Sequence, residues 1–328
     1  MSHKARWYRV HNADTIACLL CPRACLLKEG EYGSCQVRHV EHFELVTDTY
    51  GKITAIANDP IEKKPLYHFY PGSNILSIGT FGCNFACTFC QNWRISQGKP
   101  PTQDLSVREL VRAAGQNGSI GVAFTYNEPS IWYEYIMDAA PQLRQKGYKV
   151  VLVTNGYIQP EPLEELLPFV DAMNIDLKSS RDDFYKHFCG GRLKPVLETI
   201  RHASTKTHVE VTHLIVTGQN DKKEQILDLV GLVADIDKDI PLHFSRYFPQ
   251  HRYTQEATPS EFLHWAWDAA REKLTSVYLG NLQSEKGSNT TCPSCGAVVI
   301  RRLGYQVDAS GLNGHSCRAC GAQLKIVN

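Results

Sequence analysis

The sequence predicts an α/β protein built on a partial (β/α) barrel, with a small cysteine-rich metal-binding module at each end of the chain. Strand-like and helix-like segments alternate between residues 74 and 280, and the flanks on either side lack this rhythm. The cysteines also gather into three separate groups. Alternating strands and helices form right-handed βαβ units and a parallel sheet. About seven such units are too many for a simple flat sheet and indicate a full or partial barrel.

Short apolar or β-branched runs predict the strands, at 74–78, 121–126, 149–154, 172–177, 208–216, 241–247 and 277–280. Apolar residues at helical spacing predict the helices, at 106–116, 130–146, 161–169, 193–205, 222–236 and 258–271. Parallel strands are buried on both faces, which explains their continuous apolar character. In a barrel of this kind we expect the functional side chains at the carboxyl ends of the strands.

Three parts follow from this pattern. Residues 1–70 form an N-terminal arm with four cysteines, residues 71–285 form the barrel, and residues 286–328 form a C-terminal module. The polar stretch QSEKGSNTT links the last two parts.

Charge and hydropathy exclude several classes of partner. The 35 basic and 34 acidic residues nearly cancel to a formal charge of +1, so no strong attraction to nucleic acid or to a membrane surface follows. No apolar run is long enough to span a bilayer, and the first residues lack the apolar core of a secretory signal. We therefore expect a cytoplasmic protein.

Twelve cysteines are many for such a chain. Disulfides are rare in a reducing compartment, so clustered cysteines indicate metal binding or catalysis. Only Cys189 stands alone. The groups are Cys18, Cys21, Cys25 and Cys35; Cys83, Cys87 and Cys90; and Cys292, Cys295, Cys317 and Cys320.

The central group, in the segment FGCNFACTFCQNW, has the spacing C-x3-C-x2-C directly after the first predicted strand. A [4Fe–4S] cluster usually has four cysteine ligands, so three leave one iron without a protein ligand. An open position on a metal is typical of a reactive site, whereas structural sites are closed. The alternative is a three-cysteine zinc loop that a distant residue completes.

This triad resembles the hallmark of the radical S-adenosylmethionine (radical SAM) superfamily. The resemblance implies that Cys83, Cys87 and Cys90 hold a [4Fe–4S] cluster whose open iron chelates S-adenosylmethionine, and that Phe89 lies against the adenine. It also implies reductive cleavage of the cofactor to methionine and a 5′-deoxyadenosyl radical, which abstracts hydrogen from a substrate. A reduced flavodoxin or a ferredoxin-type protein would supply the electron.

Residues at later strand ends match further motifs of this superfamily. Glu128, in TYNEP, matches a Gly-Gly-Glu-Pro segment that contacts the methionyl ammonium, although Tyr126 and Asn127 replace the glycines. The alternative is a charge at a helix N-terminus. Asn155, in TNG, matches a residue near the ribose and methionine, and a simple Asn-Gly turn is its alternative.

Asp176 and Lys178 lie two residues apart, so they point to one side of a strand. The resemblance implies that the lysine lies by the cofactor carboxylate, and a buried ion pair is the alternative. His243 lies on a later strand and is a weaker candidate for facing the substrate, since buried core histidines are common.

The two outer cysteine groups predict closed metal sites. C-terminal C-x2-C pairs about twenty residues apart are typical of a zinc ribbon, although rubredoxin-like iron uses similar spacing. The N-terminal spacing C-x2-C-x3-C-x9-C suits either zinc or a second iron–sulfur cluster, which could relay electrons.

The segment DPIEKKPLYHFYP at 59–71, the start CLLCPRAC and the terminal ribbon together resemble one group. This group comprises the radical SAM proteins of the AmmeMemoRadiSam system, which are similar to pyruvate formate-lyase activating enzymes. The resemblance implies Memo-like and AMMECR-type proteins as candidate partners. Lys63, Lys64 and His68 either help to bind substrate or belong to an arm packed over the barrel mouth.

Three functions remain open at this point. The first is a radical SAM enzyme acting on a protein or peptide, for example to make a glycyl radical. The second is radical modification of a small molecule or RNA, and the near-neutral charge weakens the RNA version. The third is a non-catalytic, metal-stabilised binding protein, against which the open cysteine triad argues.

Overall fold

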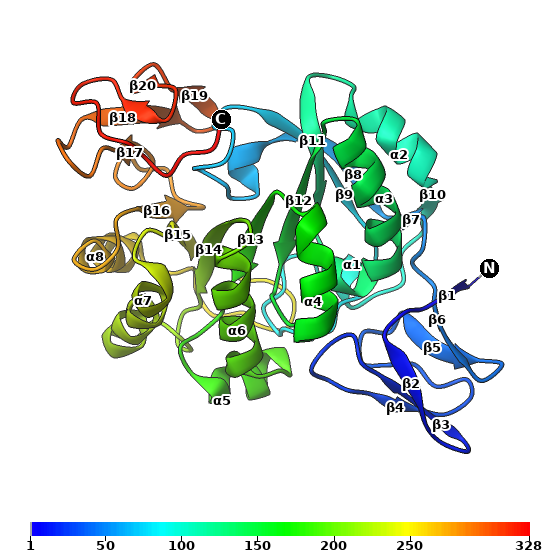
Figure 1. Ribbon diagram of the computed structural model, residues 1–328. Coiled ribbons are helices and arrows are strands. Elements are labelled where there is room, and N and C mark those ends of the chain that lie inside the picture. The colour runs from blue at the N-terminus through cyan, green and yellow to red at the C-terminus, as the bar shows by residue number, and fades with distance from the viewer. Residues whose placement is uncertain (1) are drawn as a thin grey trace.

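A computed structural model describes residues 2–328 (Figure 1). Its centre is an eight-stranded sheet with the order β16-β15-β14-β13-β12-β11-β9-β8. The strands from β9 to β16 run parallel, whereas β8 lies antiparallel to β9 at the edge. The sheet ends at β8 and β16, so the predicted partial barrel is confirmed. The strands are β8 (Ala55–Pro60), β9 (Asn74–Gly79), β11 (Ser119–Phe124), β12 (Lys149–Thr154), β13 (Ala172–Asp176), β14 (His208–Ile215), β15 (Leu242–Arg246) and β16 (Val277–Gly280).

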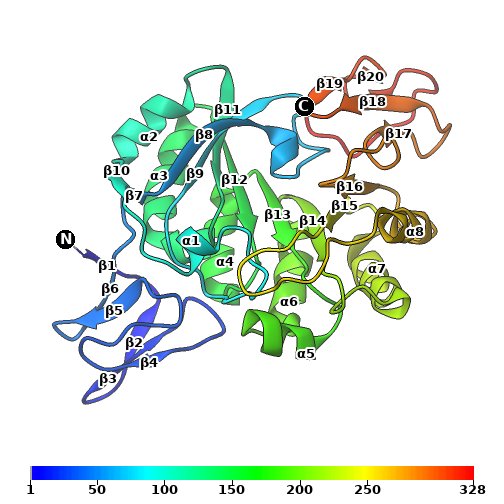
Figure 2. The ribbon, with the colours of Figure 1, turned by 180° about the vertical axis from the view of Figure 1, so that it is seen from behind.

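Helices cover one face of this curved sheet, as Figures 1 and 2 show from opposite sides. All predicted strands and helices between 74 and 280 are present. The predicted helix at 130–146 begins instead with a 3-10 turn at Pro129–Trp132. The helices are α1 (Trp93–Ser96), α2 (Val107–Ala114), α3 (Tyr133–Gln145), α4 (Pro160–Leu166), α5 (Asp182–Phe184), α6 (Leu193–Ser204), α7 (Lys223–Asp237) and α8 (Ser260–Ala270).

The N-terminal arm is made of two three-stranded sheets, with the orders β2-β3-β4 and β1-β6-β5. Strand β8, which the sequence analysis counted with the arm, joins the central sheet instead. Its sequence AIANDP has neither the β-branched run nor the apolar run that marked the other strands. The arm strands are β1 (His3–Lys4), β2 (Tyr8–Asn12), β3 (Thr15–Cys18), β4 (Leu26–Leu27), β5 (Arg38–Glu41) and β6 (Glu44–Thr47); β7 (Lys52–Ile53) pairs with β10 (Gln103–Asp104).

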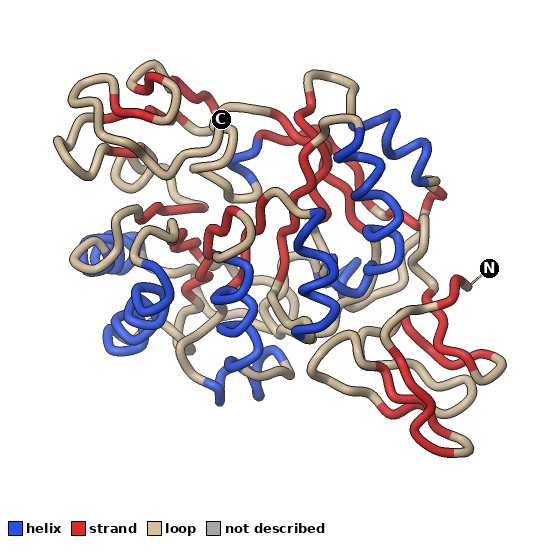
Figure 3. Tube along the Cα trace, in the orientation of Figure 1, coloured by secondary structure: helices blue, strands red, loops and turns tan. Residues whose placement is uncertain are grey.

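The C-terminal module consists of short strands and loops, and its described residues contain no helix (Figure 3). It docks on the segment before β9: the N–H of Val327 donates to the carbonyl of His68 at 2.8 Å. That segment precedes the first residues of the parallel strands, so the module lies at the opposite end of the sheet from the strand ends where function is expected. Its strands are β17 (Thr290–Thr291), β18 (Val298–Leu303), β19 (Gln306–Asp308), β20 (Leu312–Asn313) and β21 (Ser316–Cys317).

The segment at 59–71 closes that same end of the barrel from inside. Ile61, Leu66 and Phe69 are buried and pack against the first residues of the parallel strands. This packing removes a continuous apolar surface from water. In the part of the chain that the structure describes, no helix has the length and apolar character needed to cross a bilayer.

Candidate functional site

The cysteine triad lies in the loop between β9 and α1, at the carboxyl end of β9. Cys87 is buried, and Cys83 and Cys90 are partly buried. Gly82 precedes the triad with a φ of 83°, and a Cβ atom there would lie 2.4 Å from Val37. Only glycine combines that backbone angle with such a close approach, so this position lets the N-terminal arm press against the triad loop.

Donors surround the triad sulfurs. Cys83 Sγ accepts hydrogen bonds from the N–H of Phe85 at 3.3 Å and from Asn155 Nδ2 at 3.6 Å. Cys90 Sγ lies 3.2 Å from the hydroxyl of Ser96. Hydrogen bonds to sulfur are one of the means by which proteins tune an iron–sulfur cluster. Three thiols from one loop, with donors aimed at their sulfurs, fit a [4Fe–4S] cluster with one open iron.

The structure adds Cys189 to this site. Its buried thiol lies near the Cys87 sulfur and lowers the pKa of Cys87. Backbone bonds hold the two segments together: the N–H of Ala86 donates to the Cys189 carbonyl at 2.9 Å, and that of Thr88 to the Phe188 carbonyl at 3.1 Å. Cys189 ends a single π turn, a form that is frequent at functional sites. No local sequence signal could have found this contact, because it joins two distant loops.

Glu128 and Asn155 form one buried unit beside the triad. Glu128 Oε2 accepts the N–H of Asn155 at 2.7 Å, and Oε1 accepts the hydroxyl of Thr154 at 2.6 Å and the N–H of Ser130 at 2.9 Å. Burial raises the pKa of Glu128, and these donors act against that rise. The carboxylate therefore ties the end of β11 to the end of β12. Its contact with a cofactor ammonium stays a prediction.

Asn155 connects this unit to the triad loop. Besides its contact with Cys83, its Nδ2 donates to Asn84 Oδ1 at 2.8 Å, and its Oδ1 accepts the N–H of Tyr157 at 2.8 Å. The side chain is held from both ends, so its orientation toward Cys83 is set. The ribose and methionine contacts of Asn155 stay predictions.

Asp176 and Lys178 lie at the end of β13, and the Lys178 ammonium contacts Asp176 Oδ2 at 2.8 Å. Burial alone would lower the pKa of Lys178. The Asp176 carboxylate and the sulfurs of Cys87 and Cys189 outweigh burial and hold that pKa well above its ordinary value. The Lys178 ammonium thus lies near the triad, where it would attract an anionic group of a ligand.

Phe89, between the second and third cysteines of the triad, is buried and packs against Phe184 with ring centroids 5.7 Å apart. This contact sets an apolar wall on the triad loop. The contact of Phe89 with adenine stays a prediction.

The observed contacts of His243 and of the segment at 59–71 stabilise the fold. His243 is buried, and its Nε2 lies 2.6 Å from Glu210 Oε2. Lys64 is buried and pairs with Asp59 at 2.8 Å, while Lys63 is exposed. His68 contacts the hydroxyl of Tyr278 at 2.6 Å. The segment lies at the amino ends of the parallel strands, not over the mouth as the packed-arm interpretation assumed.

The four C-terminal cysteines converge on one point. The sulfurs of Cys292 and Cys320 lie 3.7 Å apart, and those of Cys295 and Cys317 lie 3.8 Å apart. All four sulfurs lie within 4.8 Å of one another. A tetrahedral zinc site with Zn–S bonds of about 2.3 Å needs sulfurs about 3.8 Å apart, so the residues fit zinc.

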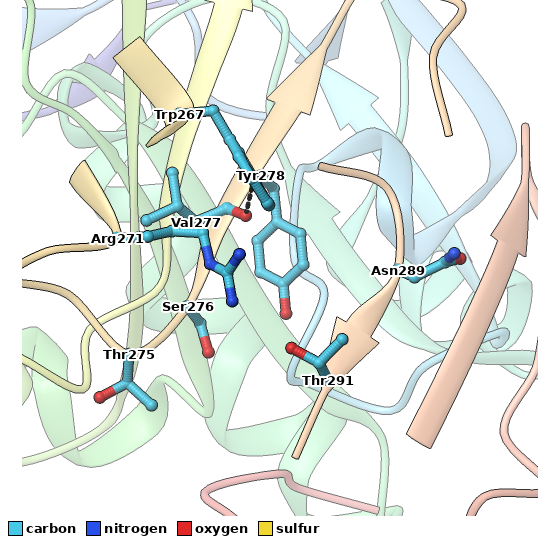
Figure 4. Close-up of a pocket in the computed structure, with 8 residues that line it drawn as sticks. All are labelled: Trp267, Arg271, Thr275, Ser276, Val277, Tyr278, Asn289 and Thr291. Carbon is cyan, nitrogen blue, oxygen red and sulfur yellow. Dashed lines mark hydrogen bonds between the residues drawn. The ribbon is translucent and has the colours of Figure 1, made fainter. Parts of the chain in front are cut away.

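A small pocket opens where α8 and the start of β16 meet the linker to this module (Figure 4). Trp267 Nε1 donates to the Val277 carbonyl at 2.8 Å in its wall, and Arg271 stacks on Trp267 with 4.4 Å to the ring centroid. None of the predicted site residues lines this pocket. It lies at the amino end of β16, away from the triad.

Comparison with known proteins supplies names for relatives of the chain. The sequence model of the radical SAM superfamily matches residues 77–232. The chain is 41% identical over 333 residues to an uncharacterized protein of Methanocaldococcus jannaschii, covering 99% of each chain. It is 27% identical over 175 residues to a pyruvate formate-lyase-activating enzyme of Clostridium pasteurianum, covering 50% of this chain and 72% of that enzyme.

Among solved structures, a radical SAM methyltransferase from Sphaerobacter thermophilus superposes with a TM-score of 0.50 at 15% sequence identity. The match covers 85% of this chain and 76% of that one. At this identity the similarity concerns the fold alone. The archaeal relative, in contrast, matches along nearly the whole chain, both cysteine-rich modules included.

Proposed function

The chain belongs to the radical SAM superfamily, and on this premise we propose that it is an activating-type enzyme that abstracts hydrogen from a protein substrate. One observation carries the proposal. The triad that suits a cluster with an open iron lies at the carboxyl end of β9, with the Asp176–Lys178 pair beside Cys87.

When bound, the [4Fe–4S] cluster supplies the electron that cleaves the sulfonium of S-adenosylmethionine to methionine and a 5′-deoxyadenosyl radical. The residues of the chain bind and orient the reactants. Cys83, Cys87 and Cys90 would hold the cluster, and the Lys178 ammonium would attract the cofactor carboxylate. Phe89 would pack on the adenine, and Glu128 and Asn155 would shape the methionine and ribose side. Packing of these groups would also keep water away from a reactive radical.

One finding supports a protein as the substrate. A relative that matches half of this chain is named for activating pyruvate formate-lyase, which is itself a protein. Memo-like and AMMECR-type proteins are the candidates that the sequence resemblance suggests, and a reduced flavodoxin or ferredoxin-type protein is the candidate donor. Zinc is our assignment for the four C-terminal cysteines.

Anaerobic reconstitution with iron and sulfide, followed by reduction in the presence of S-adenosylmethionine, tests the chemistry. We expect 5′-deoxyadenosine from the intact chain and none from Cys87→Ala. An intact cluster spectrum without 5′-deoxyadenosine would overturn the proposal.

The protein substrate needs a second measurement. A Memo-like and an AMMECR-type protein, each produced with deuterated amino acids, are added in turn. The deuterium content of the 5′-deoxyadenosine is then measured by mass spectrometry. Deuterium in the nucleoside supports hydrogen abstraction from that protein. Unlabelled 5′-deoxyadenosine with every deuterated protein contradicts these candidates, while the radical chemistry stands.

A further inference from the structure

We propose that Cys18, Cys21, Cys25 and Cys35 hold a second iron–sulfur cluster, which passes electrons to the cluster of the triad. The inference rests on the proposed radical chemistry, because an electron relay needs the triad cluster as its acceptor. Metal analysis of the N-terminal site does not depend on that chemistry.

The four N-terminal cysteines gather at one place in the arm. A Cβ atom on Gly33 would lie 3.6 Å from Cys25 Sγ and 3.8 Å from Cys35 Sγ. The N–H of Cys18 donates to the Cys25 carbonyl at 2.9 Å, and the N–H of Ala24 donates to the Cys21 carbonyl at 3.1 Å, which folds the first three cysteines into one turn. Four converging thiols form a complete donor set for a metal or a cluster.

The spacing of these sulfurs favours a cluster over zinc. In the C-terminal module all four sulfurs lie within 4.8 Å of one another, as one zinc ion requires. Over residues 2–328, no three sulfurs of the N-terminal group meet that limit, and the three of the triad do not meet it either. In a cubane each cysteine binds a different iron, so its sulfurs stand further apart than around one ion. The N-terminal sulfurs, like those of the triad, therefore do not stand at the spacing of a single zinc ion.

The arm touches the triad loop on both sides of Cys83. The carbonyl oxygen of Cys35 lies 2.7 Å from the position of a Cβ atom on Gly82, directly before Cys83. Arg23, between two of the N-terminal cysteines, donates from Nε to the carbonyl of Asn84 at 3.0 Å, directly after Cys83. Two short contacts thus connect the N-terminal segment to the two residues that flank Cys83. A purely structural metal at the far tip of an arm would not need either connection.

A buried ion pair lies beside this group. Arg38, three residues after Cys35, is only 1% exposed, and its Nη1 lies 3.1 Å from Glu134 Oε1. A guanidinium cannot lose its proton at ordinary pH, so the pair stays charged near the N-terminal cysteines.

Electrons would reach the second cluster at Cys25. Cys25 is partly exposed, whereas Cys18, Cys21 and Cys35 are buried. Its neighbour Leu26 is also exposed, at 54%. A reduced donor of the flavodoxin or ferredoxin class gives one electron to this cluster and is itself oxidised by one electron. The cluster passes that electron to the triad cluster and returns to its oxidised form, and no atom is transferred.

Metal analysis of a chain without the triad is the first test. The full-length variant Cys83→Ala/Cys87→Ala/Cys90→Ala is purified and reconstituted anaerobically with iron and sulfide. We expect about four irons and four sulfides per chain, with the Mössbauer spectrum of a [4Fe–4S] cluster, beside about one zinc. About two zinc ions per chain without cluster iron would overturn the inference. Neither result depends on cleavage of S-adenosylmethionine.

The second test uses variants of the N-terminal group and does not need the triad-free chain to fold. Cys21→Ser and Cys35→Ser should each lower the iron content from about eight to about four per chain. The rate of 5′-deoxyadenosine formation is then measured with reduced flavodoxin and with dithionite, a small reductant that can reach the triad directly. We expect the ratio of the two rates to fall at least tenfold. An unchanged ratio or unchanged iron content would contradict the relay.

Discussion

The Glu128 carboxylate accepts the backbone N–H of Asn155 at 2.7 Å, so a side chain at the end of β11 holds the loop that follows β12. Thr154 and Ser130 donate to the same carboxylate. The unit is buried, and it fixes the Asn155 amide that reaches Cys83. The candidate cofactor site is therefore assembled from three strand ends, not from the triad loop alone.

Glu128→Gln should destabilise the fold and weaken S-adenosylmethionine binding. The amide group faces three donors with only one acceptor oxygen, so a buried donor loses its partner at a cost of about 1–3 kcal/mol. Urea unfolding and equilibrium binding of the cofactor measure the two effects. Glu29→Gln is the matched control, because Glu29 also accepts two backbone N–H groups but is exposed to water. Equal losses in both variants would contradict the role of burial.

Asn155→Ala should lower the reduction potential of the triad cluster. The amide donates to Cys83 Sγ, and such a bond stabilises the more negative, reduced cluster. A bond worth about 1 kcal/mol corresponds to roughly 40 mV for one electron. An EPR-monitored redox titration measures the shift. Asn58→Ala, which removes an exposed amide bonded to Asn117, should leave the potential unchanged. A potential that stays the same in both variants would speak against this bond.

Air oxidation of the iron-free chain should join Cys87 to Cys189. Backbone hydrogen bonds hold the two cysteines close together, and dioxygen can take the two electrons and two protons that disulfide formation releases. Mass spectrometry of the digested protein should find the linked peptides. In Cys189→Ala, cluster reconstitution after air exposure should no longer require a thiol reductant. Separate alkylation of both thiols after oxidation would show that they do not pair.

Acid should destabilise the protein through His213. Burial lowers the pKa of His213 to about 4 from 6.5, and its Nδ1 lies 2.8 Å from the Leu177 carbonyl. Between pH 6.5 and 4 the unfolded chain binds a proton that the folded chain does not. Stability should therefore fall as the pH falls, by up to about 3 kcal/mol from this group.

Urea unfolding at several pH values tests this prediction. His213→Asn keeps a donor for the Leu177 carbonyl but cannot titrate, so its stability should depend less on pH over this range. The control His11→Asn, at an exposed position on β2, should keep the wild-type slope. Identical slopes in the His213 variant and the wild type would refute the assignment.

Arg302→Met should release the C-terminal module from the barrel. Arg302 is buried, its Nη2 donates to the Tyr67 carbonyl at 2.8 Å, and its guanidinium lies 3.5 Å from Glu62. Removal leaves the Glu62 carboxylate buried without its partner, at a cost of about 3–5 kcal/mol. Limited proteolysis at the linker should become faster. The neighbouring, exposed Arg301→Met is the control, and equal proteolysis of both variants would argue against Arg302 as the docking residue.

Much of this site could be predicted from the order of residues. The strand β12 was predicted with its observed ends, because a β-branched run between polar loops leaves little choice. The triad and the C-terminal cysteines were recognised because metal ligands close in sequence keep a fixed spacing. Strand β8 was missed, since it carries weak propensity and gains its place by pairing with β9.

The sequence by itself determined the class of fold, the cysteine triad and the group of four C-terminal cysteines, because periodicity and ligand spacing are local properties of the chain. Only the tertiary structure decided that Cys189 lies near Cys87, that His243 pairs with the buried Glu210 carboxylate, and that the N-terminal arm contacts Gly82 beside Cys83. Each of these contacts joins residues far apart in sequence. Whether a polar group at such a position is buried, and which partner compensates the cost of burying it, depends on how distant segments pack. No local sequence pattern contains that information.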